Sequence, residues 1–174
     1  MRFKAVVATL AAAILVVGAQ VASAQIQSCT GNLCLTTNTG TLTVNDVMQL
    51  DLSGVSTALG TPGLTDFNAG KIASTGPTAK VWSNRPYRVT VAAAAANFTY
   101  TGSLSGSKPA TDLQWNTTGS GAYTSLSTTA AELFSGTSNA GSTVGGIFYN
   151  TLLSYANDLP GSYALVVNFT LAAP

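Results

Sequence analysis

Residues 160–174 read PGSYALVVNFTLAAP, and this stretch decides the fold class. Every second side chain from residue 163 to residue 171 is large and apolar, which is the period of a β-strand with one buried face. Pro160 and Gly161 suit the two central positions of a type II turn, so we expect the strand to begin directly after them. The apolar positions are Tyr163, Leu165, Val167, Phe169 and Leu171.

The composition of the whole chain agrees with this local pattern. Charged residues make up only 7% of the chain, hydrophobic residues make up 46%, and Ser, Thr, Gly and Asn are abundant. Long solvent-facing helices draw on Glu, Lys, Gln and Arg, whereas Thr, Val and aromatic residues pack well on a pleated surface. The composition therefore predicts an all-β protein with enough apolar side chains for one hydrophobic core.

Shorter apolar segments recur along the chain and are separated by turn residues about every ten positions. This spacing predicts an antiparallel β-sandwich, Ig-like with Greek-key connections, built from about seven to ten short strands. Besides the C-terminal strand, we expect strands over residues 41–52, 80–83, 87–96, 113–118, 122–127 and 147–155, a bend at Asn45-Asp46, a turn at 84–86, loops at 60–63 and 135–142, and one helical turn over 129–134.

The first 24 residues have the three parts of a signal peptide of bacterial type. Arg2 and Lys4 form a positive start, residues 5–17 are apolar but too short to span a bilayer, and residues 22–24 read Ala-Ser-Ala, a cleavage site. We expect a single β-sandwich domain over residues 25–174, exported to a periplasm, the cell surface or the medium. No later apolar run approaches the roughly 20 residues of a spanning helix, so none is expected in the mature chain.

The only two cysteines are Cys29 and Cys34, which enclose a loop of four residues. In an oxidising compartment, two thiols so placed are expected to form one local disulfide. A metal site built on them would need further ligands, and the chain has no histidine. Lipid attachment at Cys29 is a further alternative, although residues 26–29 match a lipobox poorly and Cys34 would be left without a partner.

Charge and residue types exclude several functional classes. After signal removal, scattered Lys and Arg side chains face a similar number of acids, so no cluster suits nucleic acid. The absence of histidine removes every Ser-His or Cys-His arrangement and the commonest general base. Asp46 and Asp51 are close in sequence, but their spacing does not establish that they face each other. We expect no catalytic residues, no cofactor and no metal, with the acids serving as turn or surface residues.

Aromatic side chains offer one candidate binding site. Trp82 and Trp115, with Tyr100 and Tyr123, are able to form a stacking platform for sugars, because an exposed ring packs well on the apolar face of a glycan. Tryptophan in a β-sandwich is more often part of the core, and Trp115 shares strand parity with Leu113. Both interpretations of Trp82 and Trp115 stay open from the sequence.

The C-terminal stretch 160–174 also resembles the closing strand of bacterial secreted β-sandwich proteins, namely the WxL cell-wall-binding domains and, more loosely, pilin-like and spore-coat-U-like proteins. Those families end in a similar turn followed by an alternating strand. The Trp-x-Leu motif itself is absent, because Trp82 is followed by Ser-Asn and Trp115 by Asn-Thr. The resemblance implies an extracellular β-sandwich and does not extend to wall binding.

Three functional hypotheses follow from the sequence. The first is a non-catalytic structural or adhesion-type surface protein, whose partners are other copies or other surface proteins and whose long terminal strand can complete a neighbour's sheet. The second is a module that binds glycan or cell wall through its aromatic residues. The third is a small outer-membrane β-barrel, because alternating segments of about ten residues are also its signature.

Overall fold

The structure is a computed structural model that describes residue 31, residues 37–137 and residues 139–174. The chain divides into two units, residues 1–43 and residues 44–174. Residues 37–43 of the first unit form neither helix nor strand. The expected signal peptide at 1–24 and the expected disulfide between Cys29 and Cys34 lie outside the described residues.

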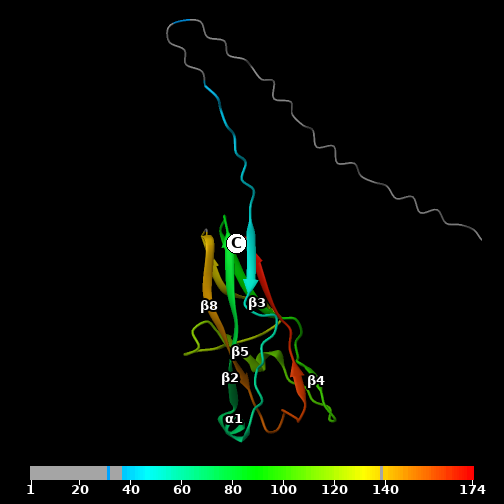
Figure 1. Cartoon of the computed structure of the whole chain (residues 1–174). Helices are drawn as coiled ribbons and strands as arrows, with labels where there is room; N and C mark the ends of the chain where they lie inside the picture. The colour runs from blue at the N-terminus through cyan, green and yellow to red at the C-terminus, as the bar shows by residue number, and fades with distance from the viewer. Residues whose placement is uncertain (1–30, 32–36, 138) are drawn as a thin grey trace, which may run out of the picture. The chain divides into compact units, whose positions relative to one another are not determined.

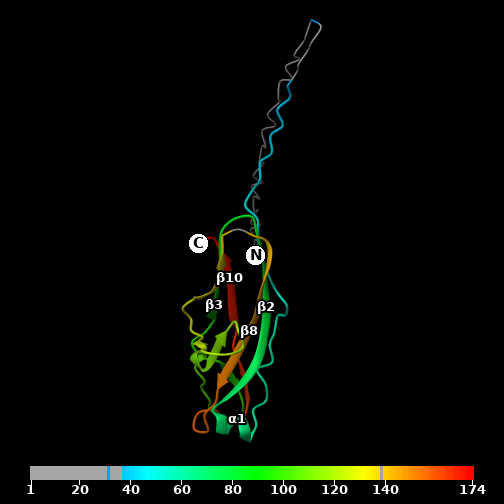
Figure 2. The same ribbon diagram turned by 90° about the vertical axis from the view of Figure 1, so that its left-hand side faces the viewer.

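The second unit is an all-β sandwich, as the sequence predicts. One sheet has the strand order β1-β2-β8-β5-β6 and another has the order β10-β3-β7, while β4 pairs with β9; every pairing is antiparallel. Figure 2 shows β2 and β8 on one side of this unit and β3 and β10 on the other. The strands are β1 (Met48–Leu52), β2 (Lys71–Ser83), β3 (Tyr87–Ala93), β4 (Thr99–Thr101), β5 (Leu113–Asn116), β6 (Thr124–Ser125), β7 (Ala131–Gly136), β8 (Asn139–Leu152), β9 (Ser162–Ala164) and β10 (Val167–Ala172).

The core lies between the two layers and draws on both. Its fully buried side chains include Val81 of β2 and Ile147 of β8 in one sheet, and Val89 and Val91 of β3 in the other. The turn at 84–86 carries the chain from β2 in the first sheet to β3 in the second. Such crossings between sheets, in place of simple hairpins, are typical of Greek-key sandwiches.

Strand β2 changes its buried face halfway along. Even-numbered residues are the less exposed ones before Gly76, and odd-numbered residues are buried after Pro77. The register with β8 shifts at the same place, between Thr75 and Thr78. A bulge of this kind inserts an extra residue and tolerates a proline inside a strand. The bulge therefore lets one long strand serve the core over its full length.

Three expectations about local structure were wrong. Residues 129–134 contain no helical turn, because Ala131–Gly136 is strand β7, which pairs with β3 and buries Leu133. The loop expected over 135–142 is shorter than predicted, because β7 ends at Gly136 and β8 already begins at Asn139. The strand expected over 41–52 begins only at Met48, after the predicted bend.

Two short helical segments, Leu64–Ala69 and the 3₁₀ helix Ala110–Asp112, were missed by the sequence analysis. Helix α1 (Leu64–Ala69) follows the expected loop at 60–63 and lies at one end of the unit (Figure 1). Asp66 Oδ2 accepts the backbone N–H of Gly63 at 2.8 Å, and Gly70 ends the helix at φ 70°. An acidic residue three positions after the cap and a left-handed glycine are ordinary helix signals, so this element was predictable.

The Gly76→Ala variant tests the bulge. A Cβ atom at residue 76 would contact the Tyr149 ring and lie 2.9 Å from Ile147 O, a backbone atom that cannot swing aside. Overpacking of this kind destabilises a core by about 1–3 kcal/mol. Urea unfolding should show this loss, and Gly54→Ala, where the nearest atom is Ser56 O at 3.7 Å, should unfold within about 0.5 kcal/mol of the parent. Equal stability of the two variants would contradict the bulge.

Candidate functional site

The C-terminal strand is split into two parts, which expose an unpaired edge. β9 pairs with β4, β10 pairs with β3, and residues 165–166 between them belong to neither strand. The expected alternation survives the break, because the odd-numbered residues from 163 to 171 are half-buried and the even-numbered ones are exposed. Within the described residues, β10 has no strand on its other side, and β1 likewise pairs only with β2.

A groove lies next to the ends of these two strands and touches β1 at Leu52 and β10 at Val167 and Phe169. One wall is the chain from Leu52 to Pro62, and the other is the chain from Asp158 to Phe169. Two adjoining cavities of about 520 and 620 Å³ make up the groove, and both are lined by Leu59 and Tyr163. An extended strand of about ten residues spans about 33 Å, so walls of this length match one added strand.

The lining of the groove is mostly apolar. Leu165, Val167 and Phe169 pack against the core and also line the groove. Val55 and Val166, which line the same cavity, are among the most exposed large apolar residues of the second unit. A contiguous exposed apolar surface of this kind marks a site of interaction with another chain or ligand.

The floor of the groove carries a tyrosine with a perturbed pKa. Tyr149 of β8 is only 3% exposed and lines the first cavity together with Leu113. Burial raises the pKa of Tyr149 from 10.0 to about 12, because the phenolate would lose its hydration. The side chain therefore serves the groove as a neutral, largely apolar surface.

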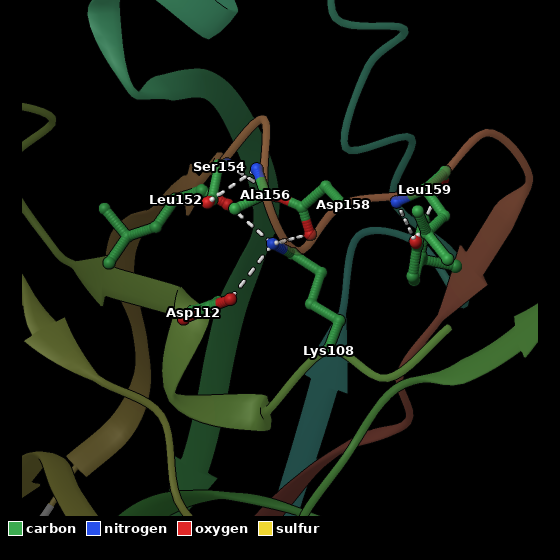
Figure 3. A network of polar contacts seen from close by, with 8 residues as sticks. Lys108, Asp112, Leu152, Ser154, Ala156, Asp158 and Leu159 are labelled. Atoms are coloured by element: carbon green, nitrogen blue, oxygen red, sulfur yellow. Dashed lines mark hydrogen bonds and ion pairs between the residues drawn. The ribbon is translucent and has the colours of Figure 1, made fainter. Parts of the chain in front are cut away.

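The second cavity is bounded by a buried ionic cluster (Figure 3). Lys108 Nζ lies 2.8 Å from Asp158 Oδ1, 3.0 Å from Asp112 Oδ2 and 2.7 Å from Leu152 O. The Lys108 side chain is 4% exposed and that of Asp158 is 7% exposed. The other carboxylate oxygen of Asp158 accepts the Ser154 backbone N–H at 2.8 Å. The cluster thus ties the loop after β8 to the loop that precedes β5.

Sequence reasoning missed this cluster. Asp158 was expected to be a solvated turn residue, whereas it is buried and paired with a lysine 50 positions away. Lys108 and Asp112 are four residues apart, and Asp112 ends a short 3₁₀ helix, Ala110–Asp112. No local signal identifies a partner so distant in the sequence.

The predicted aromatic site residues are not brought together. Trp115 lies on β5, is 7% exposed and belongs to the core cluster. Trp82 is half-buried near the C-terminal end of β2, whereas Trp115 lies beside the part of β8 that pairs with the start of β2. Lys80 Nζ lies 4.4 Å from the centre of the Trp82 ring. Tyr100 packs on Tyr163 with 4.9 Å between ring centres and donates its hydroxyl to Pro160 O. These aromatic residues do not form one platform.

The acidic residues likewise have separate partners. Asp46 pairs with Arg85, whereas Asp51 accepts a hydrogen bond from Gln49 Nε2 at 2.9 Å. In the part of the chain that the structure describes, no three His, Cys, Asp or Glu side chains are grouped so as to hold a metal ion. None of the helices seen in residues 31, 37–137 and 139–174 has the length and apolarity needed to cross a membrane.

No family model matches the chain, and no curated protein matches it. Among solved structures, the chain is similar to a chain in the structure of a chaperone-usher pilus, with a TM-score of 0.45 and 11% identity. The match covers 85% of this chain and 99% of the pilus chain.

The Lys108→Ala variant tests the ionic cluster. Removing the lysine leaves the buried Asp158 carboxylate without its counter-charge, which is expected to destabilise the fold by about 3 kcal/mol. Thermal and urea unfolding measure the loss. Lys71→Ala removes an equal charge from an exposed position of β2 and should change stability by less than about 0.5 kcal/mol. A comparable loss in both variants would show that the cluster adds nothing specific.

The tyrosine on the groove floor predicts a pH dependence of stability. The folded state holds the pKa of Tyr149 at about 12, above its ordinary value of 10.0, so alkali ionises the unfolded chain first. Stability should be intact below pH 10 and fall by about 2 kcal/mol as the pH rises from 10 to 12.

Urea unfolding measures the free energy of unfolding at each pH. In Tyr149→Phe, this free energy should fall less between pH 10 and pH 12 than in the parent. Tyr155→Phe, which changes an exposed tyrosine, should keep the parental slope. Parallel curves for all three proteins would contradict the assigned cause.

Proposed function

We propose that this protein is a non-catalytic, exported structural subunit that assembles with further copies of itself by strand addition. The observation that carries the proposal is the apolar groove between residues 52–62 and residues 158–169, next to the ends of β1 and β10, whose outer edges have no partner strand among the described residues. A strand laid in the groove would run beside residues 163–169 and fill the cavities with its side chains. Assembly at the cell surface or in the medium accords with the expected signal peptide.

The C-terminal strand acts as acceptor in this proposal. From the sequence alone, this strand is a candidate for donation to a neighbour's sheet. Both of its parts are instead hydrogen-bonded within their own chain, β9 to β4 and β10 to β3. Its role is therefore to offer its free edge, and a different segment must supply the added strand.

Residues 37–44 of a second copy are the proposed donor. This segment contains no helix or strand, and its side chains are exposed. Leu42 is 88% exposed and Val44 is 70% exposed, while Thr41 and Thr43 stand at the alternate positions. The stretch from 37 to 44 has no charged residue, which suits an apolar groove. Burying each of the two apolar side chains would contribute about 1.5–3 kcal/mol.

Assembly of the native protein tests the proposal. Protein purified from the producing cell should form oligomers whose size grows with concentration, as measured by light scattering after size exclusion and by electron microscopy. In Leu42→Asp or Val44→Asp, a charge would enter the apolar groove, so assembly should weaken at least about tenfold, the effect of 1.4 kcal/mol.

Thr43→Asp is the matched control for these variants. It adds the same charge to the same segment at the alternate position, which would face away from the groove, so assembly should be nearly unchanged. Parental protein that stays monomeric at every concentration, or equal assembly of all three variants, would refute the proposed function.

A further inference from the structure

The buried ionic cluster holds an amine against a carboxyl group. Lys108 Nζ lies 2.8 Å from Asp158 Oδ1, and the carbon that a nucleophile would attack is bonded directly to that oxygen. The two side chains are only 4% and 7% exposed, so little water competes for either of them. An amine and a carboxyl group kept in contact in this way react as parts of one molecule, which removes most of the entropic cost of joining them.

The Lys108 ammonium has three hydrogens and three acceptors (Figure 3). The acceptors are Asp158 Oδ1 at 2.8 Å, Asp112 Oδ2 at 3.0 Å and Leu152 O at 2.7 Å. Forming an amide from an ammonium and a carboxylate releases one water, which takes two of the hydrogens and leaves one on the nitrogen. The two carboxylates are placed to accept the two departing hydrogens. Leu152 O would then accept the N–H of the new amide.

The two oxygens of the Asp158 carboxylate have different surroundings. Oδ1 faces the lysine and would leave as water. Oδ2 accepts the Ser154 backbone N–H at 2.8 Å, and a donor there stabilises the negative charge that develops on the retained oxygen when the carboxyl carbon becomes tetrahedral. Lys108 and Asp158 also line the second cavity of about 620 Å³, which gives the released water a way out.

Condensation would remove the two charges that lie deepest in the cluster. An ion pair of Lys108 and Asp158 keeps two charges out of water, whereas an amide is neutral. The third member, Asp112, has a side chain that is 29% exposed, so its charge stays hydrated after the reaction. The bond would also join two residues that are 50 positions apart and close that loop covalently.

We propose that Lys108 and Asp158 condense into an intramolecular amide, with Asp112 as the base for the attacking amine. Asp112 takes one proton from the ammonium, the nitrogen lone pair attacks the Asp158 carboxyl carbon, and the bond from that carbon to Oδ1 breaks. Oδ1 leaves as water, with the proton held by Asp112 and one more proton from the nitrogen. Atoms and charge balance without a further reactant. The proposal is independent of the proposed function, because both reacting groups belong to one chain.

The mass of the full chain purified from the producing cell tests the proposal. After reduction, the protein should be lighter, by the mass of one water, than its N-terminus and sequence require. Chymotrypsin cuts after aromatic residues such as Trp115 and Tyr123, which lie between the two reacting residues, so its digest should contain a branched peptide that joins Lys108 to Asp158. The full mass in the folded protein, or a loss of water without the branched peptide, would overturn the proposal.

Variants that stay folded by circular dichroism separate the amide from the ion pair. Lys108→Ala removes charge and amine together, whereas Lys108→Arg keeps the charge on a guanidinium that stays protonated, so this variant should have its full mass. Asp112→Asn removes the base, so condensation should slow about 100-fold and newly exported protein should have its full mass. Lys71→Arg, the same exchange at an exposed position of β2, should lose water like the parent. A loss of water that persists in Lys108→Arg would overturn the amide, and one undiminished in Asp112→Asn would overturn the assigned base.

Discussion

The unpaired edge of β10 is the constraint on which the rest of the site depends. Backbone N–H and C=O groups need partners, and β10 satisfies one side against β3 while the other faces the groove. The half-buried side chains of the same strand complete part of the core and line part of the groove. Any chain that covers the groove would therefore complete a sheet and extend the hydrophobic core together, and an extended segment is the shape that does both.

Several contacts of the fold hold the walls and floor of the groove in place. The ionic cluster of Lys108 and Asp158 fixes the loop that leads into β9, at one end of the groove. The hydroxyl of Tyr100 donates a hydrogen bond to Pro160 O, further along the same loop. On the floor, the bulge in β2 makes room for the Tyr149 ring beside Gly76. These contacts lie within one chain, so the walls are preorganised and an added strand need not order them again.

Much of the fold was predictable from the sequence, whereas the site was predictable only in part. The alternation over 163–171 correctly indicated which side chains are buried, because parity is a local property. The break at 165–166 was not predictable, since it arises where the strand passes from β4 to β3. Helical propensity misled at 129–134, where pairing with β3 decides. Alternation also cannot reveal that a strand lacks a neighbour, so the groove was not predictable. The partner of Lys108 was not predictable either, because Asp158 is 50 residues away in the sequence.

The edge strand β10 lacks the charged residues that usually protect an open strand edge. Proteins that leave a strand edge in solvent usually protect it with lysine, proline or inward-pointing charge, because an unprotected edge recruits other chains. The outer strand β7 carries Glu132 on its exposed side, whereas β10 has no charged residue at all. Val166 beside β10 is exposed as well. An edge built this way would be an aggregation hazard if it stayed bare, which accords with the proposal that a specific strand covers it.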